Sequence, residues 1–324
     1  MAQIPGAGEI DRAARLLRAG GIVAFPTETV YGLGANALDA DAVARIYAIK
    51  GRPGTSPLIV HVASIEMAKS LVANWPELAD RLATRFWPGP LTLVLPKLLE
   101  TKRTHQAIIP AIVTAGLPTV GLRMPAHPVA LALIRAAGVP LAAPSANRFT
   151  ELSPATAEHV RVSLGGEIDL LLDGGPCQVG IESTVLSLVE PAPTLLRPGG
   201  VSRTALETIV GPLASPPQLL TGAHPAPGMH HRHYSPRTIL YLATHGKVPE
   251  QGQGIYLQHL HPPNRNHVAI QQMPQSATDY AAALYPALHQ ADSGSYSWIA
   301  VDMPPNAPEW EAIHDRLQRA GTKY

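Results

Sequence analysis

Residues 46–62, IYAIKGRPGTSPLIVHV, constrain the fold more than any other stretch, because they contain the end of a helix, a loop and an apolar strand. Apolar residues at helical spacing run up to Lys50, which therefore lies at the edge of the buried face of that helix. Gly51 and the proline two residues later predict the end of the helix. The strand that follows is apolar apart from His61. This order predicts a sheet covered by helices, with Lys50, Arg52 and His61 meeting at one end of it.

Helix and strand patterns alternate throughout residues 1–210. We expect helices near 10–19, 39–50, 65–73, 77–86, 127–137, 155–164 and 203–210, and strands near 22–27, 57–62, 91–95, 119–123, 139–143, 168–173, 182–188 and 194–198. Some connections are as short as hairpins, so the sheet is predicted to be mixed. The fold class is therefore α/β (α+β), with residues 1–210 as the first domain.

A proline-rich stretch at 211–237 divides the chain. Its prolines exclude regular structure over most of its length, which predicts a linker. Residues 238–324 then return to the alternating pattern, with strands near 238–243, 254–258, 267–273 and 298–303 and helices near 277–290 and 309–320. We expect this part to form a second, smaller Rossmann-like α/β domain.

The composition narrows the class of protein. The 324 residues are 46% hydrophobic and 15% charged, which is typical of a compact globular protein. No apolar run approaches membrane-spanning length, and acidic residues near the N-terminus do not fit a signal peptide. The single cysteine, Cys177, excludes an internal disulfide and a cysteine-based zinc site. These features predict a cytoplasmic protein without a membrane segment.

Several predicted strands of the first domain end in, or are flanked by, polar or cationic residues. These residues are Thr27, Glu28, Thr29, Tyr31, His61, Arg123, Ser145, Asn147, Ser183, Thr184 and Arg197. Ligands of open α/β sheets bind beyond the carboxyl ends of the strands, so the repetition predicts a binding site. For any one of these residues a turn or a helix cap is the simpler explanation, and Lys50 alone would be explained by the helix dipole.

The residue types at these strand ends indicate which ligands the site binds. Lys50, Arg52, Arg123 and Arg197 suit phosphate and carboxylate groups, and arginine can hold either in a bidentate manner. Serine, threonine and asparagine supply neutral hydrogen bonds. The sequence contains no GxSxG or HExxH motif and no Cys–His pairing, so covalent acyl chemistry and zinc hydrolysis lack support. The residues favour anionic substrates, as in phosphoryl or nucleotidyl transfer.

Two other patterns have simpler explanations. Residues 32–37 fit G-x-G-x-x-A formally, but the motif does not directly follow a strand, and the next strand lacks the required acid. Gly32 and Gly34 are expected instead to make a tight turn or to let the backbone approach a ligand. His230, His231 and His233 could bind a metal, but neither a carboxylate nor helical spacing supports it, and solvated linker histidines are favoured.

Together, FPTETVYGLGANA, KGRP followed by PLIVHV, TVGLRMP, APSAN and ESTVL resemble the YrdC-domain family, the threonylcarbamoyl-AMP synthases. PGMHHRHYSP followed by a small α/β domain resembles the longer, two-domain form. The resemblance covers about residues 10–320. It implies a twisted sheet with a cationic concave face and the formation of L-threonylcarbamoyl-AMP and pyrophosphate from L-threonine, bicarbonate and ATP. The product would pass to the machinery that threonylcarbamoylates the adenosine next to the anticodon in certain tRNAs.

The resemblance also implies roles for individual residues. The signature residues of catalysis would be Lys50, Arg52, Ser145 and Asn147. The ATP side would be lined by Arg52, Ser56, Thr119, Ser145, Ser153, Arg197 and Tyr234, and the threonine side by Thr29, His61, Arg123, Ala143 and Ser183. No protein ligand for a metal is expected, and Mg²⁺ would arrive with ATP. Tyr234 in the linker implies a lid over the site, whereas the simpler explanation is that it anchors the second domain.

The sequence leaves other functions open. A cationic concave face could bind an RNA backbone without any chemistry. Lysine and arginine nearly balance aspartate and glutamate over residues 1–210, and the whole chain has a net charge of +1, which disfavours such a role. A carbamoyltransferase of related fold would carry cysteine-rich zinc modules, which a chain with one cysteine cannot form. Direct contact with tRNA stays open.

Overall fold

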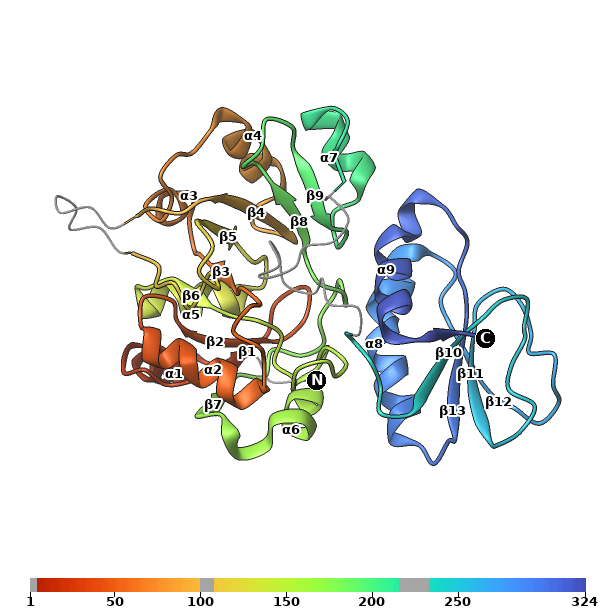
Figure 1. Ribbon diagram of the computed structural model, residues 1–324. Helices are drawn as coiled ribbons and strands as arrows, with labels where there is room; N and C mark the ends of the chain where they lie inside the picture. The colour runs from red at the N-terminus through yellow and green to blue at the C-terminus, as the bar shows by residue number, and fades with distance from the viewer. Residues whose placement is uncertain (1–4, 100–107, 216–232) are drawn as a thin grey trace.

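The computed structural model describes residues 5–99, 108–215 and 233–324. Within these ranges the chain forms two α/β units that lie side by side, the first running from red to green and the second from teal to blue (Figure 1). Helices α8 (Ala277–Ser293) and α9 (Glu311–Ala320) of the second unit lie between its own sheet and the first unit. No helix in the described ranges is long and apolar enough to cross a membrane.

The first unit is built on one mixed sheet of nine strands. Along the chain these are β1 Val23–Phe25, β2 Gly32–Asn36, β3 Ile59–His61, β4 Leu91–Pro96, β5 Thr119–Arg123, β6 Leu141–Ala142, β7 Leu170–Leu171, β8 Thr184–Ser187 and β9 Thr194–Arg197. Their order in the sheet is β7-β1-β2-β6-β3-β5-β4-β8-β9. The sheet contains parallel pairs, such as β3 with β5, and antiparallel pairs, such as β4 with β5, which confirms the predicted mixed sheet.

The helices of the first unit cover this sheet. They are α1 Ala7–Arg18, α2 Ala40–Lys50, α3 Ile65–Lys69, α4 Glu77–Phe86, α5 Pro128–Ala137, α6 Ala157–Leu164 and α7 Arg203–Val210, with a 3₁₀ turn at Gly165–Glu167. Helix α2 shows why the sequence located these ends well. The Asp39 side chain accepts the amide protons of the first turn, and Gly51 adopts a left-handed conformation with φ of 61°.

Strand β2 corrects the expectation of a tight turn at Gly32 and Gly34. These glycines lie in a strand that pairs with β1, with Phe25 opposite Gly32. A Cβ atom at Gly34 would lie 2.7 Å from Cε1 of Phe25, so the aromatic ring occupies the space that a side chain would need. The expected close approach therefore occurs mainly against Phe25 of the neighbouring strand, and Gly32 also reaches the candidate site.

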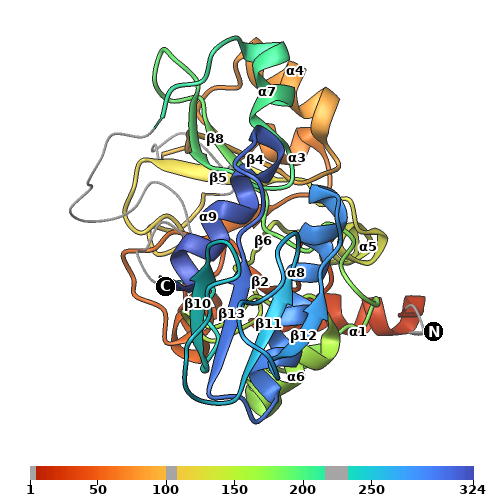
Figure 2. The same ribbon diagram turned by 90° about the vertical axis from the view of Figure 1, so that its right-hand side faces the viewer.

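The second unit contains a five-stranded parallel sheet, seen in front in Figure 2. Its strands are β10 Ile239–Ala243, β11 Gly254–Gln258, β12 Ala269–Gln272, β13 Trp298–Asp302 and β14 Thr322–Lys323, in the order β12-β11-β13-β10-β14, with a 3₁₀ turn at Pro308–Trp310. The expected strands and helices are present, whereas β14 was not expected because its two exposed residues carry no apolar pattern.

The two units share part of their hydrophobic core. Val30, Leu152 and Ile181 of the first unit belong to the same buried cluster as Leu284 and Tyr285 of α8. The backbones also approach closely, because a Cβ atom at Gly180 would lie 2.5 Å from Cα of Ala282 in α8. The second unit is therefore packed against the first over buried surface.

Candidate active site

A cavity of about 50 Å³ lies where the strand ends of the first unit meet the chain that leads into the second. The predicted site residues in its wall are Thr29, Arg52, His61, Arg123, Ala143, Ser145, Ser183, Arg197 and Tyr234. A cavity of this size holds only a few water molecules, and pockets for small ligands typically measure ~300–1,000 Å³. A substrate as large as a nucleotide therefore requires part of this wall to move.

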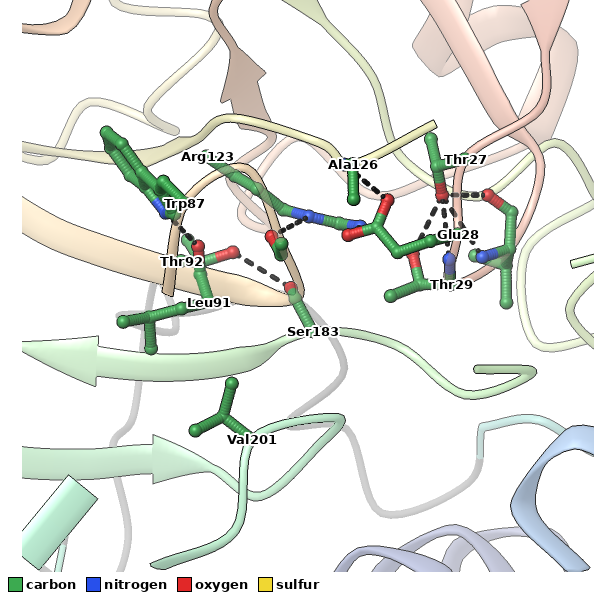
Figure 3. Close-up of polar contacts among 12 residues, drawn as sticks. Thr27, Glu28, Thr29, Trp87, Leu91, Thr92, Arg123, Ala126, Ser183 and Val201 are labelled. Carbon is green, nitrogen blue, oxygen red and sulfur yellow. Dashed lines mark hydrogen bonds and ion pairs between the residues drawn. The ribbon is translucent and has the colours of Figure 1, made fainter. Parts of the chain in front are cut away.

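Arg123 is held at the end of β5 by a buried ion pair. Its Nη2 lies 2.7 Å from Oε1 of Glu28 (Figure 3). Its Nε donates to the Gly89 carbonyl at 3.3 Å. The second carboxylate oxygen of Glu28, Oε2, accepts a hydrogen bond from the Ala126 amide, with 2.9 Å between nitrogen and oxygen. Both side chains are almost fully buried, at 4% and 7% exposure. The guanidinium is thus fixed in direction at the cavity, as a carboxylate-binding group must be.

Ser183, just before β8, is held from two sides. Its hydroxyl lies 2.8 Å from the hydroxyl of Thr92 in β4 (Figure 3). Arg197, the last residue of β9, donates from Nη2 to the Ser183 carbonyl at 2.8 Å and to its hydroxyl at 3.2 Å. Near β1, the hydroxyls of Thr27 and Thr29 lie 2.8 Å apart. Neutral hydroxyl groups therefore face the same space as the arginines.

Arg52 follows the end of α2 and is buried in the wall of the same cavity. Its Nη2 donates to the Ser56 hydroxyl at 2.7 Å and to the Pro57 carbonyl at 3.0 Å. Its guanidinium also lies over the Phe149 ring, 6.0 Å from the centroid. Burial lowers the pKa of Arg52 to about 10, so the side chain remains cationic at neutral pH.

His61 is neutral in this setting. Burial, with a smaller effect from the nearby Arg123, lowers its pKa to about 3. Its Nδ1 has no hydrogen-bond partner among the described residues, and its ring packs edge-on against Phe25 with centroids 6.2 Å apart. A buried ring nitrogen without a partner is costly, so this atom is a candidate for contact with a ligand.

Lys50 and Asn147 lie outside the cavity wall. The Lys50 ammonium donates to the carbonyl oxygens of Ser145, at 2.6 Å, and of Asn147. Burial and the nearby Arg52 hold the pKa of Lys50 well below its usual value. Asn147 donates to the carbonyls of Arg148 and Glu151, both at 2.9 Å. These two residues hold the loop that presents Ser145 to the cavity.

Three further predicted residues also lie outside the wall. Ser56 supports Arg52, as described above. Ser153 is fully buried behind the cavity, where its hydroxyl donates to Oε1 of Glu182 at 2.5 Å. Thr119 lines a separate cavity of about 10 Å³ that shares Leu58 and Ile59 with the first.

The last part of the linker enters the cavity wall. Tyr234 is 1% exposed, has a φ of 60°, and its hydroxyl has no hydrogen-bond partner in the described part of the chain. His233 is 5% exposed and packs edge-on against Phe149, so the expectation of a solvated histidine is wrong for this residue. His230 and His231 lie outside the described residues.

Two acidic residues of the site were missed by the sequence interpretation. Glu28 was recognised as a polar residue after a strand, but it was given no role. Glu182 precedes Ser183 in the ESTVL motif, lines the cavity, and was likewise not assigned. The available signal was that Glu182 is the one acidic residue of ESTVL, a motif whose other polar residues are hydroxyl-bearing.

The described parts of the chain show no protein site for a metal. Across the described ranges, no group of three or more histidine, cysteine, aspartate or glutamate side chains could hold a metal ion. The arginines and hydroxyls of the wall bind anions and polar groups and are unsuited to Mg²⁺. We therefore assign no protein ligand to Mg²⁺.

Comparison with known proteins identifies the family. Residues 15–199 match the Sua5_yciO_yrdC family model, described as telomere recombination, and residues 201–322 match the Sua5_C model, described as the threonylcarbamoyl-AMP synthase C-terminal domain. The chain belongs to the Sua5/YciO/YrdC family. It has the two-domain form that the sequence predicted.

The relatives match over most of their length. The chain is 42% identical to the threonylcarbamoyl-AMP synthase of Bacillus subtilis, across 96% of this chain and 92% of the relative. It is 49% identical to the enzyme of that name from Pyrococcus abyssi, across 70% and 66%. Its structure resembles P. abyssi Sua5 solved with L-threonine, with a TM-score of 0.88 and 36% identity across 99% and 98% of the two chains.

Proposed function

We propose that this protein is a threonylcarbamoyl-AMP synthase, a nucleotidyltransferase that forms L-threonylcarbamoyl-AMP and pyrophosphate from L-threonine, bicarbonate and ATP. The observation that carries this proposal is the single cavity in which Arg52, Arg123 and Arg197 face neutral hydroxyl groups. Such a wall has the cations and hydrogen-bonding groups that an amino acid and a triphosphate require. Relatives of this name match both domains of the chain.

L-Threonine binds on the side of Arg123. The fixed guanidinium pairs with the threonine carboxylate. Thr29 and Ser183 are hydrogen-bond partners for the threonine hydroxyl, and the neutral His61 accepts a hydrogen bond through Nδ1. Ala143 contributes a small apolar surface for the methyl group. P. abyssi Sua5 has been solved with L-threonine bound, which supports threonine as the substrate.

ATP binds on the side of Arg52 and Arg197, with Ser145 and Tyr234 in the same wall. Ser56, Ser153 and Thr119 would reach the nucleotide only after the wall has moved, since none of them lines the cavity. Lys50 and Asn147 act by holding the loop of Ser145. In this proposal Lys50 is a positioning residue, because its ammonium is already bound to two carbonyl groups.

The reaction needs no covalent intermediate with the protein. The neutral threonine amine reacts with bicarbonate, a nitrogen–carbon bond forms, and water leaves. An oxygen of the resulting carbamate then attacks the α-phosphorus of ATP, and pyrophosphate leaves with the electrons of the broken phosphorus–oxygen bond. Arg52 and Arg197 stabilise the charge that develops on the phosphates, and alignment of the substrates supplies much of the acceleration. Mg²⁺ accompanies ATP in this proposal, and no step is assigned to it.

Tyr234 and its neighbours act as a lid. The linker residue already forms part of the wall of a cavity too small for the substrates, so its movement would open the site and its return would exclude water from the labile product. Tyr234→Ala is expected to shorten the lifetime of the enzyme-bound adenylate, measured by rapid quench. An unchanged lifetime would contradict the lid and favour a purely anchoring role.

The product is passed to the tRNA threonylcarbamoyl transferase machinery, and we place the reaction in the cytoplasm with that machinery. Pyrophosphate release should require both L-threonine and bicarbonate, measured with ATP and Mg²⁺ in a coupled assay. Release without threonine would indicate another acceptor. No release despite ATP binding would favour an RNA-binding module without catalysis, an alternative that the named relatives do not support.

A further inference from the structure

A cluster of buried polar side chains joins the candidate site to the second domain. Glu182, which lines the cavity, is 7% exposed, and Arg316 of helix α9 is 1% exposed. Nε of Arg316 lies 2.6 Å from Oε2 of Glu182. The two residues are 134 positions apart in the chain and come from different domains.

The same cluster contacts the linker tyrosine at its place in the cavity wall. The Arg316 guanidinium lies over the ring of Tyr234, 5.1 Å from its centroid. The hydroxyl of Tyr285 in α8 donates to Glu182, 3.1 Å from Oε2 and 3.2 Å from Oε1. Asp315 accepts from Nη1 of Arg316 at 2.6 Å. Arg316 therefore contacts two residues of the cavity wall, Glu182 from the first domain and Tyr234 from the linker.

Glu182 presents an electrostatic problem for a site that binds ATP. A buried carboxylate in the wall would repel the triphosphate, and it would compete with the phosphates for Arg197. Burial alone would raise the pKa of Glu182, but Arg316 and Arg197 outweigh it and hold that pKa below its usual value, so the group is charged. Because Arg197 is needed for the phosphates, a cation that does not itself bind ATP has to neutralise Glu182.

We propose that Arg316 is a positioning residue for ATP, through which the second domain neutralises Glu182 and holds Tyr234 in the cavity wall. This inference rests on the proposed function. Arg316 touches no substrate in it, and it acts only through Glu182 and Tyr234. The second domain is accordingly a necessary part of the nucleotide side of the site, whereas the threonine side is built entirely from the first domain.

The chain contains a matched control for a merely structural ion pair. Arg203 at the start of α7 pairs with Glu311 of α9 across the same domain boundary, with Nη2 2.8 Å from Oε1. This pair is about one-third exposed, at 29% and 34%, and neither residue lines the active-site cavity. Loss of either pair weakens the contact between domains, but only loss of the Arg316 pair leaves an uncompensated charge at the site.

The test compares steady-state kinetics of Arg316→Gln and Arg203→Gln in the full-length chain. Arg316→Gln is expected to raise the KM for ATP by about tenfold or more, with the KM for L-threonine changed less than about threefold. Arg203→Gln should change neither KM. The double variant Arg316→Gln with Glu182→Gln should recover most of the ATP affinity, because the unpaired carboxylate is gone.

Several results would overturn the proposal. Equal effects of Arg316→Gln and Arg203→Gln, or equal changes in both KM values, would leave Arg316 with a structural role only. If Arg316→Gln does not fold, Tyr285→Phe tests the proposal instead. This variant removes one hydrogen bond to Glu182 and leaves the shape of the side chain almost unchanged. It should raise the KM for ATP alone, and an unchanged value would refute the proposal. Absence of threonine-dependent pyrophosphate release in the unmodified protein would instead refute the proposed function.

Discussion

At the scale of single residues, Arg123 has to serve two anions at once. It pairs with Glu28 inside the protein, and in the proposed function it also binds the threonine carboxylate. The planar guanidinium can do both, whereas a lysine ammonium is a point charge that Glu28 would retain. Arg123→Lys is therefore expected to weaken threonine binding by about tenfold or more, with ATP affinity within about twofold, measured by calorimetry. Arg135→Lys, on α5, is the control, and equal threonine affinity in both variants would contradict the assignment.

His61 gives the protein a defined sensitivity to acid. Its pKa is about 3 in the folded state and about 6.5 in an unfolded chain. Between these values the unfolded state binds the additional proton, so the free energy of unfolding must fall as the pH is lowered from about 7 towards 3. In His61→Gln, the number of protons taken up on unfolding near pH 4.5 should decrease by about one.

The measurement is urea denaturation across this pH range, compared between the variant and the unmodified protein. His267→Gln, at an exposed histidine, is the matched control. If His61→Gln shows the same pH dependence as His267→Gln, the folded protein does not keep His61 neutral.

At the scale of elements, strand β2 depends on glycine because of its neighbour. Gly34→Ala would place a methyl group 2.7 Å from the Phe25 ring, and the strain is expected to lower the free energy of unfolding by about 1–3 kcal/mol. Phe25→Leu in the same chain should recover part of that loss, since it removes the ring atoms in contact. Gly166→Ala, where nothing lies within 4 Å, is the control. Additive effects of Gly34→Ala and Phe25→Leu would show that the two residues do not interact.

Sequence patterns located most elements but not the contacts between them. Helix α2 was predictable because Asp39 and Gly51 mark its ends locally. Strand β2 was not predictable, because its glycines are required by the Phe25 ring on the neighbouring strand β1. The APSAN motif predicted that Ser145 and Asn147 belong to one site. Only Ser145 lines the cavity, because the Asn147 side chain donates instead to the backbone carbonyl of Glu151. The pairing of Glu182 with Arg316 depends on how two domains pack, which no local pattern encodes.

At the scale of the whole molecule, the carboxyl ends of the strands in the second domain are occupied by hydrogen bonds within that domain. Ligands of parallel sheets bind beyond the carboxyl ends of the strands. Here the amides of Leu260 and His261, after β11, both donate to the Asp302 carboxylate at the end of β13, at 2.6 Å. The Asp302 carboxylate thus accepts the hydrogen bonds that these amides could otherwise donate to an anionic ligand. The part of this domain that matters for the site is instead the face of α8 and α9 turned towards the first domain.

The shared core predicts that the two domains unfold together. Gly180 lies against the backbone of α8 with a φ of 75°, so Gly180→Ala would both strain the loop and push the helix away. We expect one calorimetric transition for the unmodified protein and two for Gly180→Ala, because the domains then no longer stabilise each other. Gly211→Ala carries the same backbone strain, with a φ of 77°, but meets nothing within 4 Å. It should lower the melting temperature and keep a single transition. Two transitions in the unmodified protein, or one in Gly180→Ala, would show that the domains are stable independently or are coupled elsewhere.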